Sequence, residues 1–191
     1  MLRFRPTMKF AKWYFNNAIH RLVPMRWRRV GKRGPSMVLL LRNPHEFSEE
    51  EIRRAVERAW AVSFSVAEGS TRRIMTTENA VFVQAGPHRL SFVNYPKPYE
   101  EKPEEDLDWL PKLSQQQAWA EHTACCWVNY ATSKTDLEVA HSVLAKVVAE
   151  LLDENCTGVY IPTESSLIPA EDAFTDLQTL GSYRSSALIP E

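Results

Sequence analysis

The chain has 191 residues, of which 44% are hydrophobic and 25% are charged, so it is long enough to bury the core of one domain. No apolar run approaches the roughly 20 residues that a membrane-spanning helix needs, and three cysteines, two of them adjacent, do not make a disulfide framework. The net charge of −1 hides an asymmetry, because residues 1–36 carry ten Lys and Arg and no acid, whereas residues 37–191 carry thirteen Lys and Arg against 24 acids. We expect a cytoplasmic protein with two dissimilar parts.

Residues 1–36 are predicted to be a basic N-terminal extension, either accessory or disordered. Apolar side chains at helical spacing between residues 7 and 23 would give it an amphipathic cationic helix, which is suited to an anionic membrane surface or to nucleic acid. A mitochondrial targeting peptide is a further interpretation, although the segment is poor in serine. The side chains that would contact an anionic surface are Arg21, Arg26, Arg28, Arg29, Lys32 and Arg33.

The folded part is predicted to begin at Met37. The apolar run 37–41 is typical of a strand covered on both faces. Ser48 and Glu51 form a capping box, which predicts a helix whose apolar stripe runs from Ile52 to Trp60. Alternating residues at 62–66 predict a second strand, so this half of the domain is expected to read strand, helix, strand.

Two further strands are expected at 80–84 and 89–95, as a β-hairpin around Gly86-Pro87. The acidic, proline-containing stretch 96–111 is interpreted as an exposed linker within the domain, without the fixed spacing of a calcium loop. Ser114 and Gln117 predict a short helix that ends near residue 121.

The strongest periodicity follows, as a strand at 123–131, a helix from about Asp136 to Asp153 and a strand at 158–161. Such a unit favours parallel strands joined by a right-handed crossover. The buried stripe of the helix is predicted to contain Leu137, Ala140, Leu144, Val147, Val148 and Leu151. A helix is also predicted at 171–180, and residues 176–191 are expected to be a loose tail.

The candidate pocket residues are Trp119, Glu121 and His122, because His122 stands where a short helix meets a strand and side chains often converge there. The competing interpretation is a core histidine that is neutral and hydrogen-bonded, and the same interpretation applies to His141. Cys125 and Cys126 point to opposite faces of a strand and cannot chelate one metal together. No catalytic residue, metal ligand or cofactor is assigned.

Several patterns resemble an uncharacterised bacterial family, catalogued as domain of unknown function 4261. They are the leading Met37-Val-Leu-Leu-Leu, the hairpin that ends in Tyr95-Pro-Lys-Pro98, the Trp119-Ala-Glu-His122 entry to a strand, and the helix that closes on Gly158-Val-Tyr-Ile161. The resemblance covers about residues 37–175. It implies a bacterial cytoplasmic α+β domain and carries no assigned activity.

The predicted fold is a single α+β domain over residues 37–175, with a mixed sheet of about six strands, helices packed on it and two strand-helix-strand halves for which a ferredoxin-like arrangement is the closest analogy. The first functional hypothesis is a non-enzymatic interaction or ligand-binding domain with a protein partner. The alternatives are a small hydrolase or transferase with a cleft near His122, and a peripheral membrane or nucleic-acid protein that acts through residues 1–36.

Overall fold

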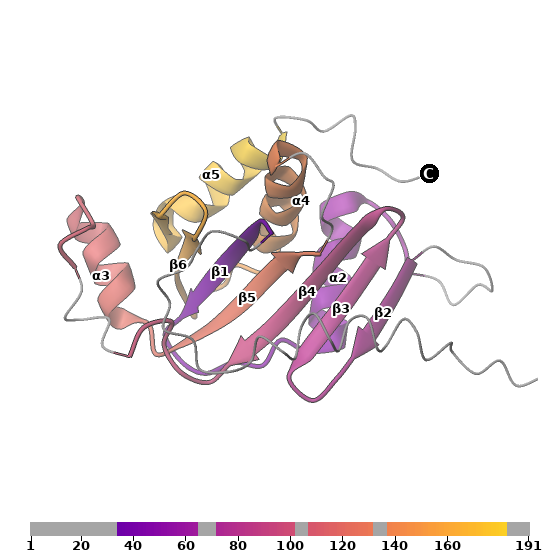
Figure 1. Cartoon of the computed structure of the whole chain (residues 1–191), viewed down its shortest axis with the longest axis horizontal. Coiled ribbons are helices and arrows are strands. Elements are labelled where there is room, and N and C mark those ends of the chain that lie inside the picture. Colours follow the sequence, from indigo (N-terminus) through magenta and orange to yellow (C-terminus); the bar gives the residue numbers. More distant parts are fainter. Residues whose placement is uncertain (1–33, 65–71, 102–106, 132–136, 183–191) are drawn as a thin grey trace, which may run out of the picture. The chain divides into compact units, whose positions relative to one another are not determined.

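The computed structural model describes residues 34–64, 72–101, 107–131 and 137–182, with side chains up to Thr179. These residues form an α+β fold with one antiparallel sheet of seven strands, in the order β2-β3-β4-β5-β1-β6-β7 (Figure 1). The elements in chain order are β1 (Ser36–Leu41), α2 (Glu49–Trp60), β2 (Arg72–Thr76), β3 (Ala80–Ala85), β4 (His88–Tyr95), α3 (Leu113–Glu121), β5 (Ala124–Tyr130), α4 (Leu137–Ala149), β6 (Cys156–Ile161), β7 (Ser166–Pro169) and α5 (Ala170–Ser182).

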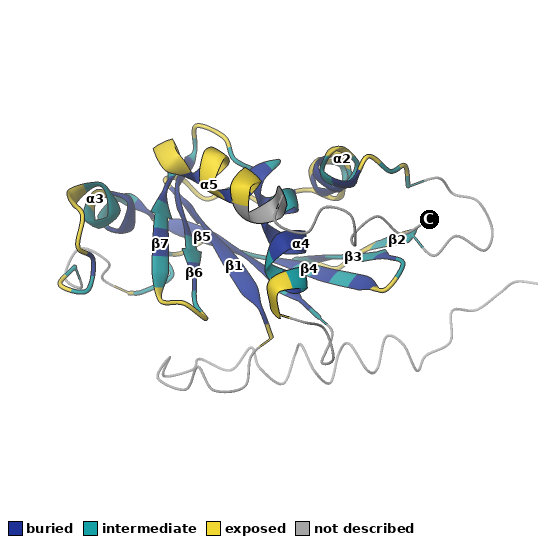
Figure 2. Cartoon of the chain, turned by 90° about the horizontal axis from the view of Figure 1, so that it is seen from above, coloured by how far each residue is buried: buried dark blue, intermediate teal, exposed yellow. Residues whose placement is uncertain are grey.

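Helices α2, α4 and α5 form a layer on one face of the sheet, as the view along the sheet shows (Figure 2). Helix α4 lies in the middle of this layer, since it contacts α2, α5, β1 and β5. Helix α3 packs on β6 and β7 from the opposite face. The sheet therefore separates a large core under three helices from a smaller core under α3.

Strand β1 is buried along its whole length, as its continuous apolar run predicts. Leu39 and Leu41 face the large core, whereas Val38 and Leu40 face the small one. The adjacent strand β5 follows the same alternation, so Cys126 lies in the large core and Cys125 in the small one. The prediction that these two thiols face opposite sides is confirmed.

Helix α2 begins as its sequence predicts. The Ser48 hydroxyl accepts a hydrogen bond from the Glu51 backbone N–H at 3.3 Å, and the Glu51 carboxylate accepts one from the Ser48 backbone N–H at 2.7 Å. Phe47 precedes the cap and is buried, and the apolar stripe from Ile52 to Trp60 faces the core. The capping box thus fixes the residue at which α2 begins, and the apolar residues of the helix face the core.

Strand β5, helix α4 and strand β6 form the expected crossover unit. Both strands pair antiparallel with β1, so they run in the same direction with β1 between them. Because α4 lies between α2 and α5, it buries more of its surface than a single stripe, and Leu144 is fully buried. Leu137 is 59% exposed, so its assignment to the buried stripe was wrong.

The structure corrects several details of the predicted architecture. The sheet is antiparallel with seven strands, where a mixed sheet of about six was expected, and the ferredoxin-like analogy is not confirmed. Residues 62–64 form no strand, so the strand predicted at 62–66 is absent from its described part. The strand that follows α2 is instead the outer strand β2, which the sequence did not indicate.

Near the C-terminus, the short strand β7 was also not predicted. It pairs closely with β6, since a Cβ atom added to Gly158 would lie 2.8 Å from the Ile168 carbonyl oxygen and 3.5 Å from Cβ of Ala118 in α3. Glycine therefore permits the close approach of β7 and α3 at this position. Helix α5 extends to Ser182, so residues 176–182 belong to a helix and not to a loose tail.

Candidate functional site

His122 lies at the junction of α3 and β5 and is 1% exposed. Its Nδ1 atom lies 2.5 Å from the Trp119 carbonyl oxygen, which can only accept, so Nδ1 carries the proton. Its Nε2 atom accepts a hydrogen bond from the Tyr99 backbone N–H at 3.0 Å. Burial lowers the pKa of His122, although the bond to the Trp119 carbonyl opposes that shift. The ring is neutral and both nitrogens are occupied, which confirms the core interpretation of this histidine.

The structure brings together only two of the three candidate pocket residues. The rings of Trp119 and His122 lie 5.2 Å apart and both side chains are buried. The Glu121 carboxylate instead lies at the surface, 2.7 Å from the Gln117 amide nitrogen and 3.1 Å from Nη2 of Arg42. The Gln117 bond and then the Arg42 guanidinium hold the pKa of Glu121 below its usual range. Glu121 therefore joins the end of α3 to the loop after β1.

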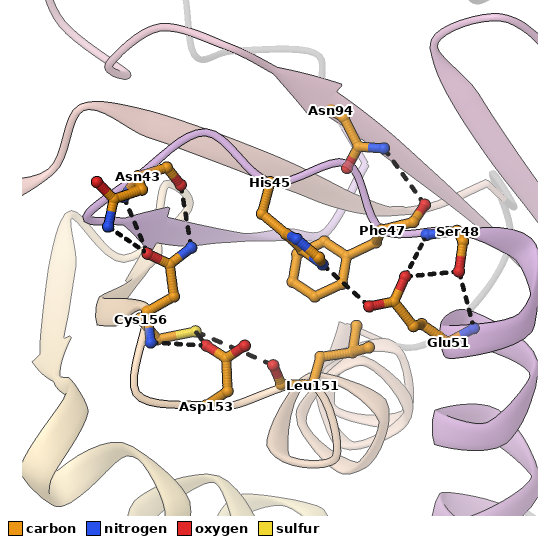
Figure 3. A network of polar contacts seen from close by, with 10 residues as sticks. Asn43, His45, Phe47, Ser48, Glu51, Asn94, Leu151, Asp153 and Cys156 are labelled. Atoms are coloured by element: carbon orange, nitrogen blue, oxygen red, sulfur yellow. Dashed lines mark hydrogen bonds and ion pairs between the residues drawn. The ribbon is translucent and has the colours of Figure 1, made fainter.

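A polar network occupies the same end of the sheet (Figure 3). The amide of Asn155 accepts from the backbone N–H of Asn43 at 2.9 Å and donates to its carbonyl oxygen at 3.0 Å. Nearby, His45 lies 3.0 Å from the Glu51 carboxylate and packs edge-on against Phe47. These contacts fix the loop between β1 and α2 against the turn between α4 and β6. Their role is structural, because each polar group binds another part of the chain.

The three thiols are unsuited to nucleophilic chemistry. Cys125, Cys126 and Cys156 are free and buried. Burial raises the pKa of Cys125 and of Cys156 to about 12, and it raises that of Cys126 as well. The thiolate, which is the reactive form, is therefore scarce at neutral pH. Within the described ranges, no three His, Cys, Asp or Glu residues gather closely enough to hold a metal ion.

Two other histidines contact polar partners. Nδ1 of His88 lies 2.6 Å from the Tyr130 hydroxyl in the large core, and burial lowers the pKa of His88. His141 is only partly buried, with Nδ1 3.3 Å from the Glu164 carboxylate and Nε2 3.2 Å from the Thr163 hydroxyl. His141 thus connects α4 with the turn between β6 and β7, and the expectation of a core position was too simple.

An aromatic cluster covers the small core on the α3 side. The buried Trp119 lies at the base of this cluster and contacts three half-buried rings. Its ring centroid lies 5.7 Å from that of Tyr99, 5.0 Å from that of Trp109 and 5.3 Å from that of Tyr160. Tyr160 also contacts Tyr99 at 5.2 Å and Trp109 at 5.7 Å. Tyr99 also stacks on Trp127, with ring centroids 5.6 Å apart and an interplanar angle of 13°. We call Tyr99, Trp109 and Tyr160 the aromatic surface.

The aromatic surface depends on the segment 96–111, which corrects the prediction of an exposed linker there. Leu107 and Leu110 of that segment pack on the small core together with Tyr99 and Trp109. His122 holds the same segment through the backbone of Tyr99. The large aromatic residues within the acidic run were the available signal for this packing, and the prolines and acids around them concealed it.

The Nε1–H group of Trp119 has no hydrogen-bond acceptor within the described residues, although the residue is only 2% exposed. Buried indole N–H groups usually have a partner. The rings that contact Trp119 offer only their faces, which are at best weak acceptors.

Carboxylates flank the aromatic surface along the chain. Glu101 and Asp108 are exposed, and neither forms an ion pair with another described residue. Burial raises the pKa of Tyr160, and the negative charge of Glu100 adds to that effect against a hydrogen bond from Ser165. Glu100, Glu101 and Asp108 therefore lie near the aromatic surface along the chain, with Lys97 and Lys112 at the ends of the same segment.

The six basic residues predicted to contact an anionic surface, from Arg21 to Arg33, lie outside the described residues. None of the helices within the described ranges has the length and apolar content needed to cross a bilayer. Comparison with known proteins finds no matching family, no matching curated protein and no matching solved structure.

Proposed function

We propose that this domain is a non-enzymatic interaction module, which binds a protein partner through the aromatic surface of Tyr99, Trp109 and Tyr160. The observation that supports this function is the gathering of three half-buried rings, two from the segment 96–111 and one from β6, against a buried tryptophan. Tyrosine and tryptophan are the residues most enriched at binding hot spots, because they bury a large area with few rotatable bonds.

Buried side chains support the aromatic surface from beneath. Trp119 lies beneath the rings, Trp127 stacks under Tyr99, and the buried His122 fixes the Tyr99 backbone. A surface that is ordered before binding loses little conformational freedom when a partner docks.

The alternative of a hydrolase or transferase centred on His122 gains no support from this geometry, because a general base must be reachable by substrate. The membrane or nucleic-acid role of residues 1–36 stays a prediction from the sequence. So do the cytoplasmic location, the bacterial origin and the resemblance to the uncharacterised family.

The test is affinity isolation from cells that make the protein, with the wild type, Trp109→Leu and Phe174→Leu as baits. Phe174 is a suitable control, since it is 49% exposed on α5, away from the aromatic surface. We expect a protein that the wild type and Phe174→Leu retain equally and that Trp109→Leu loses, and this loss should recur with purified components. Equal retention of every bound protein by Trp109→Leu would refute the proposal.

A further inference from the structure

We infer that the partner element bound by the aromatic surface is a basic segment that presents arginine side chains. This inference rests on the proposed function and specifies the chemistry of the partner. A cation above the face of a tryptophan or tyrosine ring is attracted by the negative charge of that face, and arginine is the cation most often found there.

The charge around the rings favours a cationic partner. In the described part of the stretch 96–112, the acids Glu100, Glu101 and Asp108 outnumber the lysines Lys97 and Lys112, which gives a net charge of −1. Elsewhere in the described residues, several carboxylates are matched by cations, as Glu50 is by Arg53 and Arg54 and Glu150 is by Arg58. Glu101 and Asp108 have no such ion pair with a described residue, so a cation that binds beside the rings gains an attraction that the fold does not already satisfy.

Two lysines of the same segment oppose this attraction. Lys97 and Lys112 are both exposed, and Lys97 lies close enough to Cys125 to influence its thiol. The three described acids of the stretch still outnumber these two lysines. A partner whose cations reach Asp108 and Trp109 would therefore meet a region in which negative charge predominates.

Arginine suits this surface better than lysine. A guanidinium is planar, so it can lie flat against a ring while its N–H groups donate to a neighbouring carboxylate. Asp108 is exposed and directly precedes the half-buried Trp109 in the chain.

The acidic helix α5 is the main competing surface. It carries Glu171, Asp172 and Asp176 without a base, and Phe174 is exposed between them. A single phenylalanine offers one weak ring for a cation, whereas the aromatic surface offers a tryptophan and two tyrosines. Helix α5 therefore supplies the control for binding that depends on negative charge alone.

The experiment is calorimetric titration of the full chain, at about 0.15 M salt, with a peptide of alternating arginine and glycine and with its lysine counterpart. We expect the arginine peptide to bind, Trp109→Leu to weaken binding at least about threefold, and Phe174→Leu to leave it unchanged. Asp108→Asn, which removes a charge without removing a packed ring, should weaken binding as well. The lysine peptide should bind at least about threefold more weakly than the arginine peptide.

Absence of binding, equal binding by Trp109→Leu, or equal binding of both peptides would overturn the inference. Self-association of the protein that depends on Trp109 would also overturn it, because the occupant would then be a second copy. If affinity isolation yields a partner that needs Trp109 but no arginine, the proposed function stands and only this inference fails. A melting curve for each variant confirms that its fold is intact.

Discussion

The backbone N–H of Tyr99 donates to Nε2 of His122 across 3.0 Å, which joins the aromatic surface to the junction of α3 and β5. On its other side, the imidazole binds the Trp119 carbonyl oxygen. One neutral ring thus holds two members of the aromatic cluster at fixed positions. This histidine supports a surface that it does not itself present to solvent, since it is 1% exposed.

Substitution of His122 should therefore loosen the fold. His122→Ala leaves the Tyr99 N–H and the Trp119 carbonyl without their partner, so we expect a loss of about 1–3 kcal/mol in the free energy of unfolding. His122→Gln keeps an amide that can replace part of this bonding and should cost less. Urea denaturation of both variants measures the difference. A wild-type midpoint for His122→Ala would contradict the structural role.

Acid should destabilise the protein through His88 and His122. Burial lowers the pKa of both in the folded state, so the unfolded chain takes up their protons first as the pH falls. Their contribution to stability is complete above the unfolded pKa of about 6.5 and is lost as the pH falls from there through the lower folded pKa. Urea midpoints at several pH values test this, and His122→Gln should flatten part of the dependence. A His122→Gln protein with an unaltered pH dependence would exclude the role of that residue.

Two leucines of α4 provide a matched test of the helix orientation. Leu144 is fully buried between the helical layer and the sheet, so Leu144→Ala should cost about 2–5 kcal/mol. Leu137 is 59% exposed, so Leu137→Ala should change stability by less than about 0.5 kcal/mol. Denaturant melts give both values. Similar costs for the two variants would mean that the helix is turned differently.

The three thiols should be protected in the folded protein. Cys125, Cys126 and Cys156 are each at most 3% exposed and their pKa values are raised by burial. We expect a thiol reagent such as Ellman's reagent to react slowly with the native protein at pH 8 and to detect all three thiols in guanidinium chloride. Rapid native reaction of any one of them would show that its strand is accessible.

Local patterns predicted the parts of the fold that local physics decides. The capping box of Ser48 and Glu51, the hairpin around Gly86 and the periodicity of α4 each need only neighbouring residues, and each has its expected form. Gly86 lies at φ 56°, a conformation in which glycine carries no steric penalty. The position of a strand in the sheet depends on distant partners, which is why β2 and β7 were not predicted.

Helix ends were less predictable than helix faces. The start of α3 was assigned to Ser114 and Gln117, but the cap residue is Lys112, whose backbone N–H donates to the Gln115 side chain at 3.2 Å. Asn155, beyond the end of α4, does not have the positive φ angle that often ends a helix, and its amide binds Asn43, 112 positions away in the chain. That partner has no local signature.

The candidate site was predicted only in part. His122 and Trp119 were correctly placed beside each other, but Glu121 turns to Arg42 at the surface. Tyr99 and Trp109 share the segment 96–111, but Tyr160 lies in β6, far from them in the sequence, and only tertiary packing brings the three together. A cluster that depends on tertiary packing cannot be read from spacing.

The most direct test of the binding surface uses tryptophans that the chain already contains. The indole N–H signals of Trp109 and Trp119 report on the aromatic surface, whereas that of Trp60 reports on the large core. Like Trp119, Trp60 has a buried indole N–H group without an acceptor among the described residues. Two-dimensional NMR with a partner from affinity isolation, or with the arginine peptide, compares them after assignment by substitution. We predict that the Trp109 and Trp119 signals shift on binding and that the Trp60 signal does not. Saturated binding that shifts Trp60 and leaves Trp109 and Trp119 unchanged would contradict the account.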